Sequence, residues 1–360
     1  MGRRHGGAGT DRAMGDGRPP GPRSALSART TNQALFVALF LVFATGPGAV
    51  ATGSARGRWV VIAHGIAAIA VVLLIPWKSM VVRRGLRRSR RARWVSVLLA
   101  VLVLVALVAG FVSSTGLTRS VGGLLVMWLH IAVALALVPL LFWHVLARST
   151  RPRRADLSRR NALRLGALAA VAAVGYAIVE ATIRLTGAPG ARRRFTGSHE
   201  VASFEPARMP VTSWLDDRVP SIDPASWRLV VIDGTGRREL ALPELSEPDT
   251  RVRATLDCTS GWYAEQDWTG VPVASLVRPD KAARSLYVHS VTGYWVRLPI
   301  EDLDSLLLAT RVGDRPLRAG HGYPLRLVAP GRRGFWWVKW VDRIELDPTP
   351  AWWQPPLPVT

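Results

Sequence analysis

Residues Leu124–Leu146 read LLVMWLHIAVALALVPLLFWHVL, 23 consecutive residues without Asp, Glu, Lys or Arg. A helix rises about 1.5 Å per residue, so this stretch spans roughly 34 Å, enough to cross a bilayer core of about 30 Å. Four other stretches are similarly apolar, and Glu180 is the only acidic residue in the five. Buried helices of soluble proteins can be as apolar, but five in succession with basic connectors favour a membrane domain. The predicted spans are Gln33–Val50 (the weakest, because Gly-Pro-Gly interrupts its end), Trp59–Pro76, Trp94–Val112, Leu124–Leu146 and Leu163–Leu185.

The basic side chains are concentrated in the first half of the chain. The formal net charge is +22, of which residues 1–184 carry +21. The N-terminal tail and the connectors after the second and fourth spans hold 21 Lys and Arg, whereas the other two connectors hold three. The positive-inside rule therefore predicts a multi-pass cell-membrane protein with a cytoplasmic N-terminus and an extracytoplasmic region after about residue 186. Because the charge lies between apolar runs rather than on one folded surface, we expect membrane lipid as its partner and no nucleic acid.

The second half of the chain has the composition of an ordinary soluble domain, with a net charge of +1. Its short alternating apolar runs, such as residues 227–232 and 325–328, are separated by turn residues and predict a mostly β, α+β domain. About 150 residues are enough to bury a core. The predicted division is a disordered basic tail at 1–30, an all-α five-helix membrane domain at 31–186, a linker at 187–201, the β-rich domain at 202–350 and a C-terminal tail at 351–360.

The fifth predicted span follows the sequence SRRNALR at Ser158–Arg164. This resembles the twin-arginine export motif S-R-R-x-F-L-K, with Ala162 in place of Phe and Arg164 in place of Lys. Paired arginines are common in this chain, so the alternative is one more basic connector. The span behind the motif is rich in Ala and Gly and therefore only mildly hydrophobic, which favours the signal. The resemblance implies the twin-arginine export machinery as a partner and a domain that folds around a cofactor before export.

Cys258 is the only cysteine of the chain. This excludes an intrachain disulfide, a cysteine-ligated iron–sulfur cluster and an ordinary structural zinc site. A lone cysteine is most often a small buried apolar residue. Two chemical roles stay open: a nucleophile, which would need a base such as His289 or His321, and a thiolate ligand of a soft metal.

Two sequence blocks carry a resemblance to a known family. The first is CTSGW…WTGVP, between Cys258 and Pro272, and the second runs from HGYPLRLVAPG at His321–Gly331 to GFWWVKW at Gly334–Trp340. In this order and spacing they resemble the sulfite oxidase family of molybdopterin enzymes, over about residues 222–346. Within it, the chain resembles the catalytic subunit of periplasmic methionine-sulfoxide reductases, here fused to a membrane helix bundle. The resemblance implies a molybdopterin-binding domain, a Mo-molybdopterin cofactor and oxygen-atom transfer.

The resemblance also implies a set of site residues. In that family one cysteine thiolate binds molybdenum, which assigns Cys258 as metal ligand and catalytic residue. Tyr294 is the second expected catalytic residue, with core packing as its alternative. For Arg326 the alternative is an exposed strand charge, and for His321 a surface histidine. The expected cofactor contacts are Thr212, Ser213, Ser290, His321, Arg326, Lys339 and the backbone of Trp337 and Val338.

The sequence also departs from the sulfite oxidase pattern. The sulfite-binding arginines of that family have no clear counterpart, so reduction of a small-molecule or peptide-borne S- or N-oxide is favoured over sulfite oxidation. The chain ends soon after Lys339. We therefore expect it to resemble the members that lack the dimerisation domain.

Three of the seven histidines lie in the predicted spans. His64 and His130 are at similar depths from the outer ends of their helices and would suit the two axial positions of one b-type haem. His144 lies 14 residues after His130, about 21 Å along the same helix face. A second haem would need a histidine at position 78, where Lys78 stands, so at most one haem is expected. The alternative is a haem-free bundle in which the histidines form hydrogen bonds between helices.

We interpret the chain as a membrane-bound molybdenum oxidoreductase that exchanges electrons with the membrane, through the haem and the quinone pool. Two alternatives are a cofactor-free binding module on a membrane anchor and a b-type cytochrome with an accessory domain. The first predicts tolerance of Cys258→Ser, and the second predicts haem without molybdenum.

Overall fold

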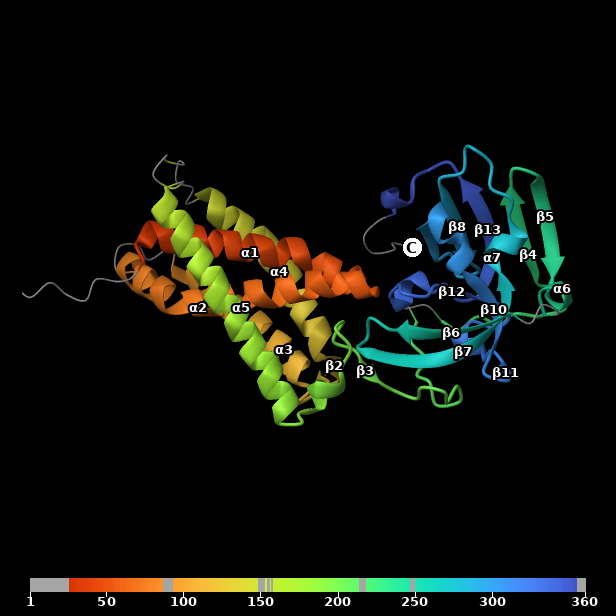
Figure 1. The fold of residues 1–360 in the computed structure, drawn as a ribbon, viewed down its shortest axis with the longest axis horizontal. Coiled ribbons are helices and arrows are strands. Elements are labelled where there is room, and N and C mark those ends of the chain that lie inside the picture. The colour runs from red at the N-terminus through yellow and green to blue at the C-terminus, as the bar shows by residue number, and fades with distance from the viewer. Residues whose placement is uncertain are drawn as a thin grey trace, which may run out of the picture.

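The computed structural model describes residues 26–86, 93–147, 158–213, 218–246 and 250–354, together with residues 153 and 156. A helix bundle is followed by a β-rich domain, which lies at the end of the bundle where α1 ends and α2 begins (Figure 1). The predicted fold class, a five-helix bundle with a mostly β domain, is confirmed. The prediction of a disordered tail lies outside the described residues as far as residue 25.

Five helices in the described part of the chain are long and apolar enough to cross a membrane. Pro47 lies inside the first helix, which continues past the predicted interruption. The fourth helix begins two residues later than predicted, because Leu124 and Leu125 pair with Ser120 and Val121 in a short hairpin. The helices are α1 Ala28–Ala51, α2 Arg58–Leu86, α3 Arg93–Thr115, α4 Val126–Ala147 and α5 Arg159–Leu185.

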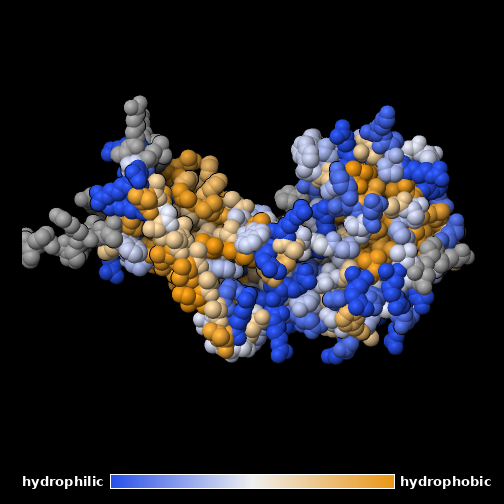
Figure 2. All heavy atoms as spheres, viewed as in Figure 1, coloured by the Kyte–Doolittle hydropathy of each residue, from blue (hydrophilic) through white to orange (hydrophobic). Residues whose placement is uncertain are grey.

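Small residues bring the helices together. Ala38, Ala70 and Ala172 form a buried cluster where α1, α2 and α5 meet. Gly65 of α2 lies directly under the ring of Tyr176 of α5, where a Cβ atom would come within 2.4 Å of the ring. Close backbone approach at small residues is the usual basis of helix packing in membranes. The outward surface of the bundle is predominantly apolar, whereas the β-rich domain exposes mainly hydrophilic residues (Figure 2).

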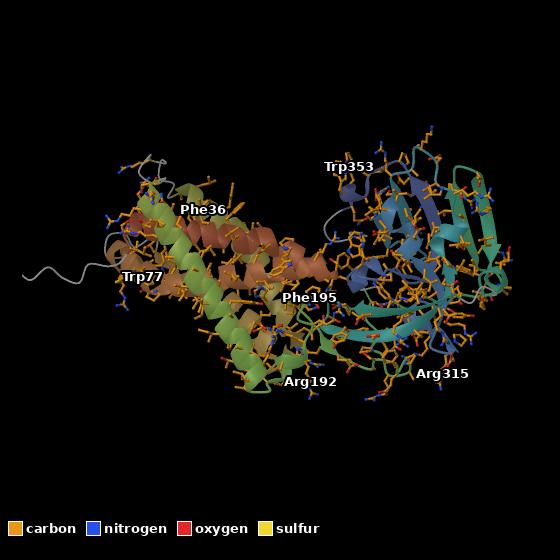
Figure 3. The ribbon with its side chains drawn as sticks, viewed as in Figure 1. Phe36, Trp77, Arg192, Phe195, Arg315 and Trp353 are labelled. Atoms are coloured by element: carbon orange, nitrogen blue, oxygen red, sulfur yellow. The ribbon has the colours of Figure 1, made fainter. Side chains whose placement is uncertain are left out.

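Residues 87–92 of the first Arg-rich connector and residues 148–152, 154, 155 and 157 of the second lie outside the described residues. Trp77 of α2 lies at the end of the bundle remote from the β-rich domain, whereas Arg192 and Phe195 lie at the junction with that domain (Figure 3). Asp156, between α4 and α5, pairs with Arg29 at the start of α1. Ser158 is the N-cap of α5, so the paired arginines of the SRRNALR motif occupy its first turn.

The β-rich domain contains two sheets and one continuous core. The first sheet has the order β5-β4-β13-β8-β9, with β4 and β13 parallel. The second has the order β11-β10-β7-β3, with β12 paired to β10 and β6 to β7. Buried side chains of both sheets form one cluster, such as Leu229, Val288 and Leu298 with Trp268 and Leu308. The strands are β3 His199–Glu200, β4 Arg228–Asp233, β5 Gly236–Ala241, β6 Thr250–Asp257, β7 Trp262–Pro272, β8 Ser285–Ser290, β9 Trp295–Pro299, β10 Leu307–Val312, β11 Arg315–Pro316, β12 Arg326–Val328 and β13 Val341–Asp347.

The predicted linker, residues 187–201, contains two short regular elements. Its first part is a 3₁₀ turn, η3, at Pro189–Arg192. Its last part is β3, which pairs in parallel with Trp262 and Tyr263 at the start of β7. The linker therefore joins the sheet that carries the segment around Cys258.

Candidate active site

A pocket of about 530 Å³ opens beside Cys258. This empty volume includes open solvent at the mouth of the pocket. The pocket is built where the turn between β6 and β7 meets the loops that follow β8 and precede β13. The lining residues are Thr212, Ser213, Cys258, Thr259, Ser290, Thr292, Tyr294, Gly334, Phe335, Trp337, Val338, Lys339 and Trp340.

Cys258 lies at the end of β6 in a tight turn. Its N–H donates to the carbonyl of Trp262 at 2.8 Å, and its carbonyl accepts from Gly261, whose positive φ of 91° permits the turn. The side chain is largely buried, with its Sγ 3.1 Å from Ser260 Oγ. Gly334 packs against the Cys258 backbone, and a Cβ atom there would lie 3.1 Å from Cys258 Cα. The thiol is thus held in one place on the pocket wall.

Arg326 lies behind this wall and is 1% exposed. Its guanidinium donates to the His321 carbonyl at 3.0 Å and lies 5.1 Å from the Trp268 ring centroid. Burial lowers the pKa of Arg326 to about 10, while the negative charge of a Cys258 thiolate opposes this shift. Among the described residues no carboxylate pairs with it, and its Nε atom has no hydrogen-bond partner. The alternative of an exposed strand charge is therefore wrong.

His321 is also buried, so the alternative of a surface histidine is wrong as well. Its Nε2 lies 3.1 Å from the Met209 carbonyl, and Arg318 Nε lies 3.3 Å from its Nδ1. Because Arg318 can only donate, Nδ1 accepts and Nε2–H donates, which is the neutral form of the ring. Burial and the nearby charges of Arg326, Arg318 and Lys339 lower the pKa of His321 to about 4.

Lys339 connects three segments at the pocket. Its Nζ donates to the carbonyls of Thr212, at 2.8 Å, and Gly320, at 2.7 Å. The following residue, Trp340, has a left-handed φ of 52°, a strained conformation for a bulky side chain. The Trp340 indole N–H donates to the Ala319 carbonyl at 2.7 Å, which helps to hold this conformation.

The structure brings most of the predicted site residues to one pocket. Tyr294 lines it, but its hydroxyl donates to the Phe335 carbonyl, so this tyrosine also fixes the loop before β13. Arg326 and His321 do not line the pocket; they support its wall from behind. The predicted residues that line it are Thr212, Ser213, Cys258, Ser290, Tyr294, Trp337, Val338 and Lys339.

Sequence reasoning missed several side chains around Cys258. Arg333 is 4% exposed, pairs with Asp257 at 2.7 Å and donates to the Cys258 carbonyl at 3.3 Å. Ser260 and Gly334 contact Cys258 directly. One signal was present in the sequence, proximity to the two blocks: Asp257 and Ser260 flank the cysteine, Gly334 begins the GFWWVKW block and Arg333 directly precedes it.

Comparison with known proteins assigns the domain. Residues 216–353 match the family described as oxidoreductase molybdopterin binding domain. The C-terminal domain belongs to the sulfite oxidase family. Its relatives include the mitochondrial sulfite oxidase of Rattus norvegicus, 25% identical over 166 residues, which cover 36% of this chain and 30% of that protein.

Two further proteins are similar to this sulfite oxidase-family domain. An uncharacterized oxidoreductase of Bacillus subtilis, YuiH, is 27% identical over 115 residues, covering 30% of this chain and 58% of its own. The structure of the sulfane dehydrogenase SoxCD from Paracoccus pantotrophus matches with 24% identity and a TM-score of 0.35, covering 36% of this chain and 40% of that one. The chain spans about a third of the length of the rat sulfite oxidase.

The residues of the sulfite oxidase-family pocket fit a molybdopterin cofactor. A buried cation without an anionic partner is costly, and Arg326 has only the Cys258 sulfur as a source of negative charge among the described residues. A thiolate-bound metal cofactor that carries its own negative charge would satisfy it. No group of three His, Cys, Asp or Glu in the described part of the chain could hold a metal. A metal at Cys258 would thus take its other ligands from the cofactor.

The membrane histidines lie close together within the bundle. His64 of α2 and His130 of α4 have ring centroids 6.2 Å apart and planes at 81°. His64 Nδ1 lies 3.1 Å from the Val42 carbonyl, and His130 Nδ1 lies 2.8 Å from the Ala106 carbonyl. If each Nδ1–H donates to its carbonyl, the tautomer leaves Nε2 as an acceptor. Neither Nε2 has a hydrogen-bond partner among the described residues. Lys78 Nζ donates to Asn32 Oδ1 at 3.0 Å, away from this pair.

The low pKa of His321 predicts a pH-dependent stability of the domain. An unfolded histidine has a pKa of about 6.5, so between pH 6.5 and pH 4 the unfolded chain binds a proton that the folded chain does not. Stability is therefore complete above pH 6.5 and falls by about 3 kcal/mol as the pH drops to 4. His321→Gln should lose this part of the slope in urea denaturation at pH 7 and pH 4, whereas His289→Gln should keep it. Equal slopes in wild type and His321→Gln would contradict the assignment.

Proposed function

We propose that this protein is a membrane-bound molybdenum oxidoreductase that transfers an oxygen atom to or from an S- or N-oxide. One observation carries the proposal: the only cysteine lines a pocket in a sulfite oxidase-family domain, with two buried arginines close to it. Arg326 and Arg333 place positive charge close to Cys258, and the thiolate is the form of cysteine that binds metals.

The pocket residues divide the work of holding Mo-molybdopterin. Cys258 Sγ would be the protein ligand of the metal, and Lys339, Ser290 and the backbone of Trp337 and Val338 would face the rest of the cofactor. When bound, the cofactor supplies the two-electron chemistry of oxygen-atom transfer. The turn at Cys258 would position the metal ligand, and the buried arginines would provide a fixed positive electrostatic potential at the site.

The lining favours a neutral, dipolar oxide as substrate. Its polar side chains are mainly hydroxyls, from Thr212, Ser213, Ser290 and Thr292, which can donate to an oxide oxygen. Lys339 is the only cationic side chain in the lining of the described residues, and its ammonium already donates to two carbonyls. Binding a dianion such as sulfite would require more cationic side chains in the lining than Lys339 alone. A small molecule or a peptide-borne oxide therefore fits better, and the same geometry serves the reverse oxidation.

The pair His64 and His130 supports a b-type haem as the electron carrier to this site. Two imidazoles bound to opposite sides of one metal ion, with bonds of about 2 Å, have centroids about 6 Å apart, close to the 6.2 Å separation. A histidine ligand usually donates its other N–H to a carbonyl, as both Nδ1 atoms are placed to do. A quinone of the membrane is the proposed redox partner on the lipid side.

The arrangement of the chain supports an extracytoplasmic site. The end of α1, the hairpin between α3 and α4 and the β-rich domain lie at one end of the bundle (Figure 1), whereas Trp77, at the start of the first Arg-rich connector, lies at the opposite end (Figure 3). With the positive-inside rule, this end faces away from the cytoplasm. Export of the domain by the twin-arginine machinery, read from Ser158–Arg164, belongs to the same proposal. Protease digestion of intact spheroplasts should remove the domain, and its protection would contradict this orientation.

Counting metals in detergent-purified protein tests the function. The protein is produced in cells able to make the cofactor, and molybdenum and iron are measured per chain. We expect about one molybdenum and one iron per chain, with reduction of S- or N-oxides by a dithionite-reduced viologen dye. Iron without molybdenum would favour a b-type cytochrome with an accessory domain. Neither metal would favour a cofactor-free binding module.

A further inference from the structure

Asp257, the residue before Cys258, is the centre of a buried polar cluster. It is 1% exposed. Its Oδ1 accepts from Ser198 Oγ at 2.7 Å and from Arg333 Nη1 at 2.7 Å. Its Oδ2 accepts from Thr196 Oγ1 at 2.8 Å and lies 3.1 Å from Arg194 Nε, an ion pair without hydrogen-bond alignment. Three of these four partners belong to the linker between the helix bundle and the domain.

The linker is in turn fixed to the helix bundle. Arg193 forms an ion pair with Glu180, the only acidic residue of the predicted spans, and also donates to the Gly190 carbonyl at 2.7 Å. Gly190 packs on the end of α3 so closely that a Cβ atom would lie 2.2 Å from the Ser114 carbonyl oxygen. A charge within a membrane helix is costly unless paired, so the Glu180–Arg193 pair is a defined attachment.

A second contact joins the bundle to the same place. Thr52, at the end of α1, forms an isolated β-bridge with Arg332. Gly53 approaches this loop so closely that a Cβ atom would lie 2.7 Å from the Arg332 carbonyl carbon. The next residue, Arg333, donates both to Asp257 and to the Cys258 carbonyl. Both bundle contacts therefore converge on the residues that hold the Cys258 backbone.

We propose that Asp257 is a positioning residue through which the membrane bundle sets the place of Cys258. A fully buried carboxylate shared by two arginines and two hydroxyls is a rigid centre, because moving any partner leaves a buried charge unsatisfied. Asp257 transmits this constraint to the adjacent cysteine, whose carbonyl also accepts from Ser198 at 3.3 Å. The bundle is thus part of the support of the active site as well as its anchor. The role assigned to Cys258 rests on the proposed function, whereas the coupling itself does not.

The test uses the full-length protein and separates the linker from the carboxylate. Arg194→Gln with Thr196→Val removes two linker contacts and leaves the Asp257–Arg333 pair in place. Asp257→Asn weakens the whole cluster. The matched control is Asp267→Asn, which breaks the exposed Asp267–Arg253 pair of 2.9 Å on the neighbouring strand.

Two measurements are made on each variant: hydrogen exchange of the segment 256–262, and the molybdenum content with its Mo(V) electron paramagnetic resonance spectrum. The Cys258 amide, which donates a hydrogen bond to the Trp262 carbonyl, should exchange roughly tenfold faster in both cluster variants. The affinity for molybdenum should fall about 10–100-fold in Asp257→Asn. The Mo(V) signal should shift in both, while Asp267→Asn matches wild type.

Wild-type exchange and an unchanged Mo(V) signal in the linker double variant would overturn the coupling, even if Asp257→Asn lost its metal. That result would leave Asp257 as a local partner of Arg333 only. A wild-type protein free of molybdenum would refute the proposed function. Hydrogen exchange can be measured without the metal, so it would still decide whether the bundle is coupled to the Cys258 segment.

Discussion

Replacing Cys258 by serine is expected to remove molybdenum from the protein and to lower oxide reduction by at least about 100-fold. The replacement changes one atom and fits the same space, since the side chain is largely buried between Ser260 and Gly334. The serine oxygen is a harder donor than the cysteine sulfur, and the hydroxyl is a much weaker Brønsted acid than the thiol. Serine is therefore a poor ligand for this metal at neutral pH. Elemental analysis and the viologen-linked assay measure the two losses.

Ser260→Ala is the matched control for this prediction. Its Oγ is 3.1 Å from the Cys258 sulfur but outside the proposed ligand set, so the variant should keep molybdenum near one per chain. Cys258→Ser with wild-type molybdenum would show that the cysteine is not the ligand. A wild type without molybdenum that is also unaffected by Cys258→Ser would favour the cofactor-free binding module instead.

The helix bundle could be predicted from the sequence because its signal is local. Apolar runs without charges define a span wherever they occur, and all five were found, although α2 continues to Leu86, ten residues past the predicted end of its span at Pro76. The errors have local causes that hydropathy does not capture. Leu124 and Leu125 are apolar but belong to a hairpin with Ser120 and Val121, and Pro47 is tolerated inside α1.

Only those site residues that lie in the two sequence blocks could be predicted with their neighbours in the pocket. Those blocks contain Cys258, Trp337 and Lys339, which the fold does bring to one pocket. The blocks do not show how deeply a side chain is buried. Arg326 and His321, which were expected as cofactor contacts, are buried behind the pocket wall. The contacts between Arg194, Asp257 and Arg333 join segments far apart in the chain, one of them expected to be a plain linker. Only the three-dimensional structure could bring these together.

His64→Ala and His130→Ala are each expected to abolish the visible absorption of a b-type haem and to reduce iron from about one per chain to near zero. Each variant would remove one of the two proposed haem ligands, and a single remaining histidine binds haem far more weakly. Molybdenum should stay near one per chain, since the two histidines lie in α2 and α4 and the cofactor pocket lies in the β-rich domain. Electron delivery from a quinol should fail, while viologen-driven reduction should persist because the dye reaches the domain directly.

His144→Ala is the control, because His144 lies on the same helix as His130, about 21 Å further along. Lys78 stands at the position where a second histidine ligand would be expected, so His144 lies outside the proposed haem pair. Its variant should keep the full haem spectrum. Iron retained in His64→Ala and His130→Ala, or a wild type without iron, would leave the pair as hydrogen-bonded residues of a haem-free bundle. In a haem-free bundle the two Nδ1 atoms would keep their hydrogen bonds to the carbonyls of Val42 and Ala106, so these contacts are compatible with both alternatives. The absorption spectra of the two single variants therefore separate the haem-binding bundle from the haem-free one.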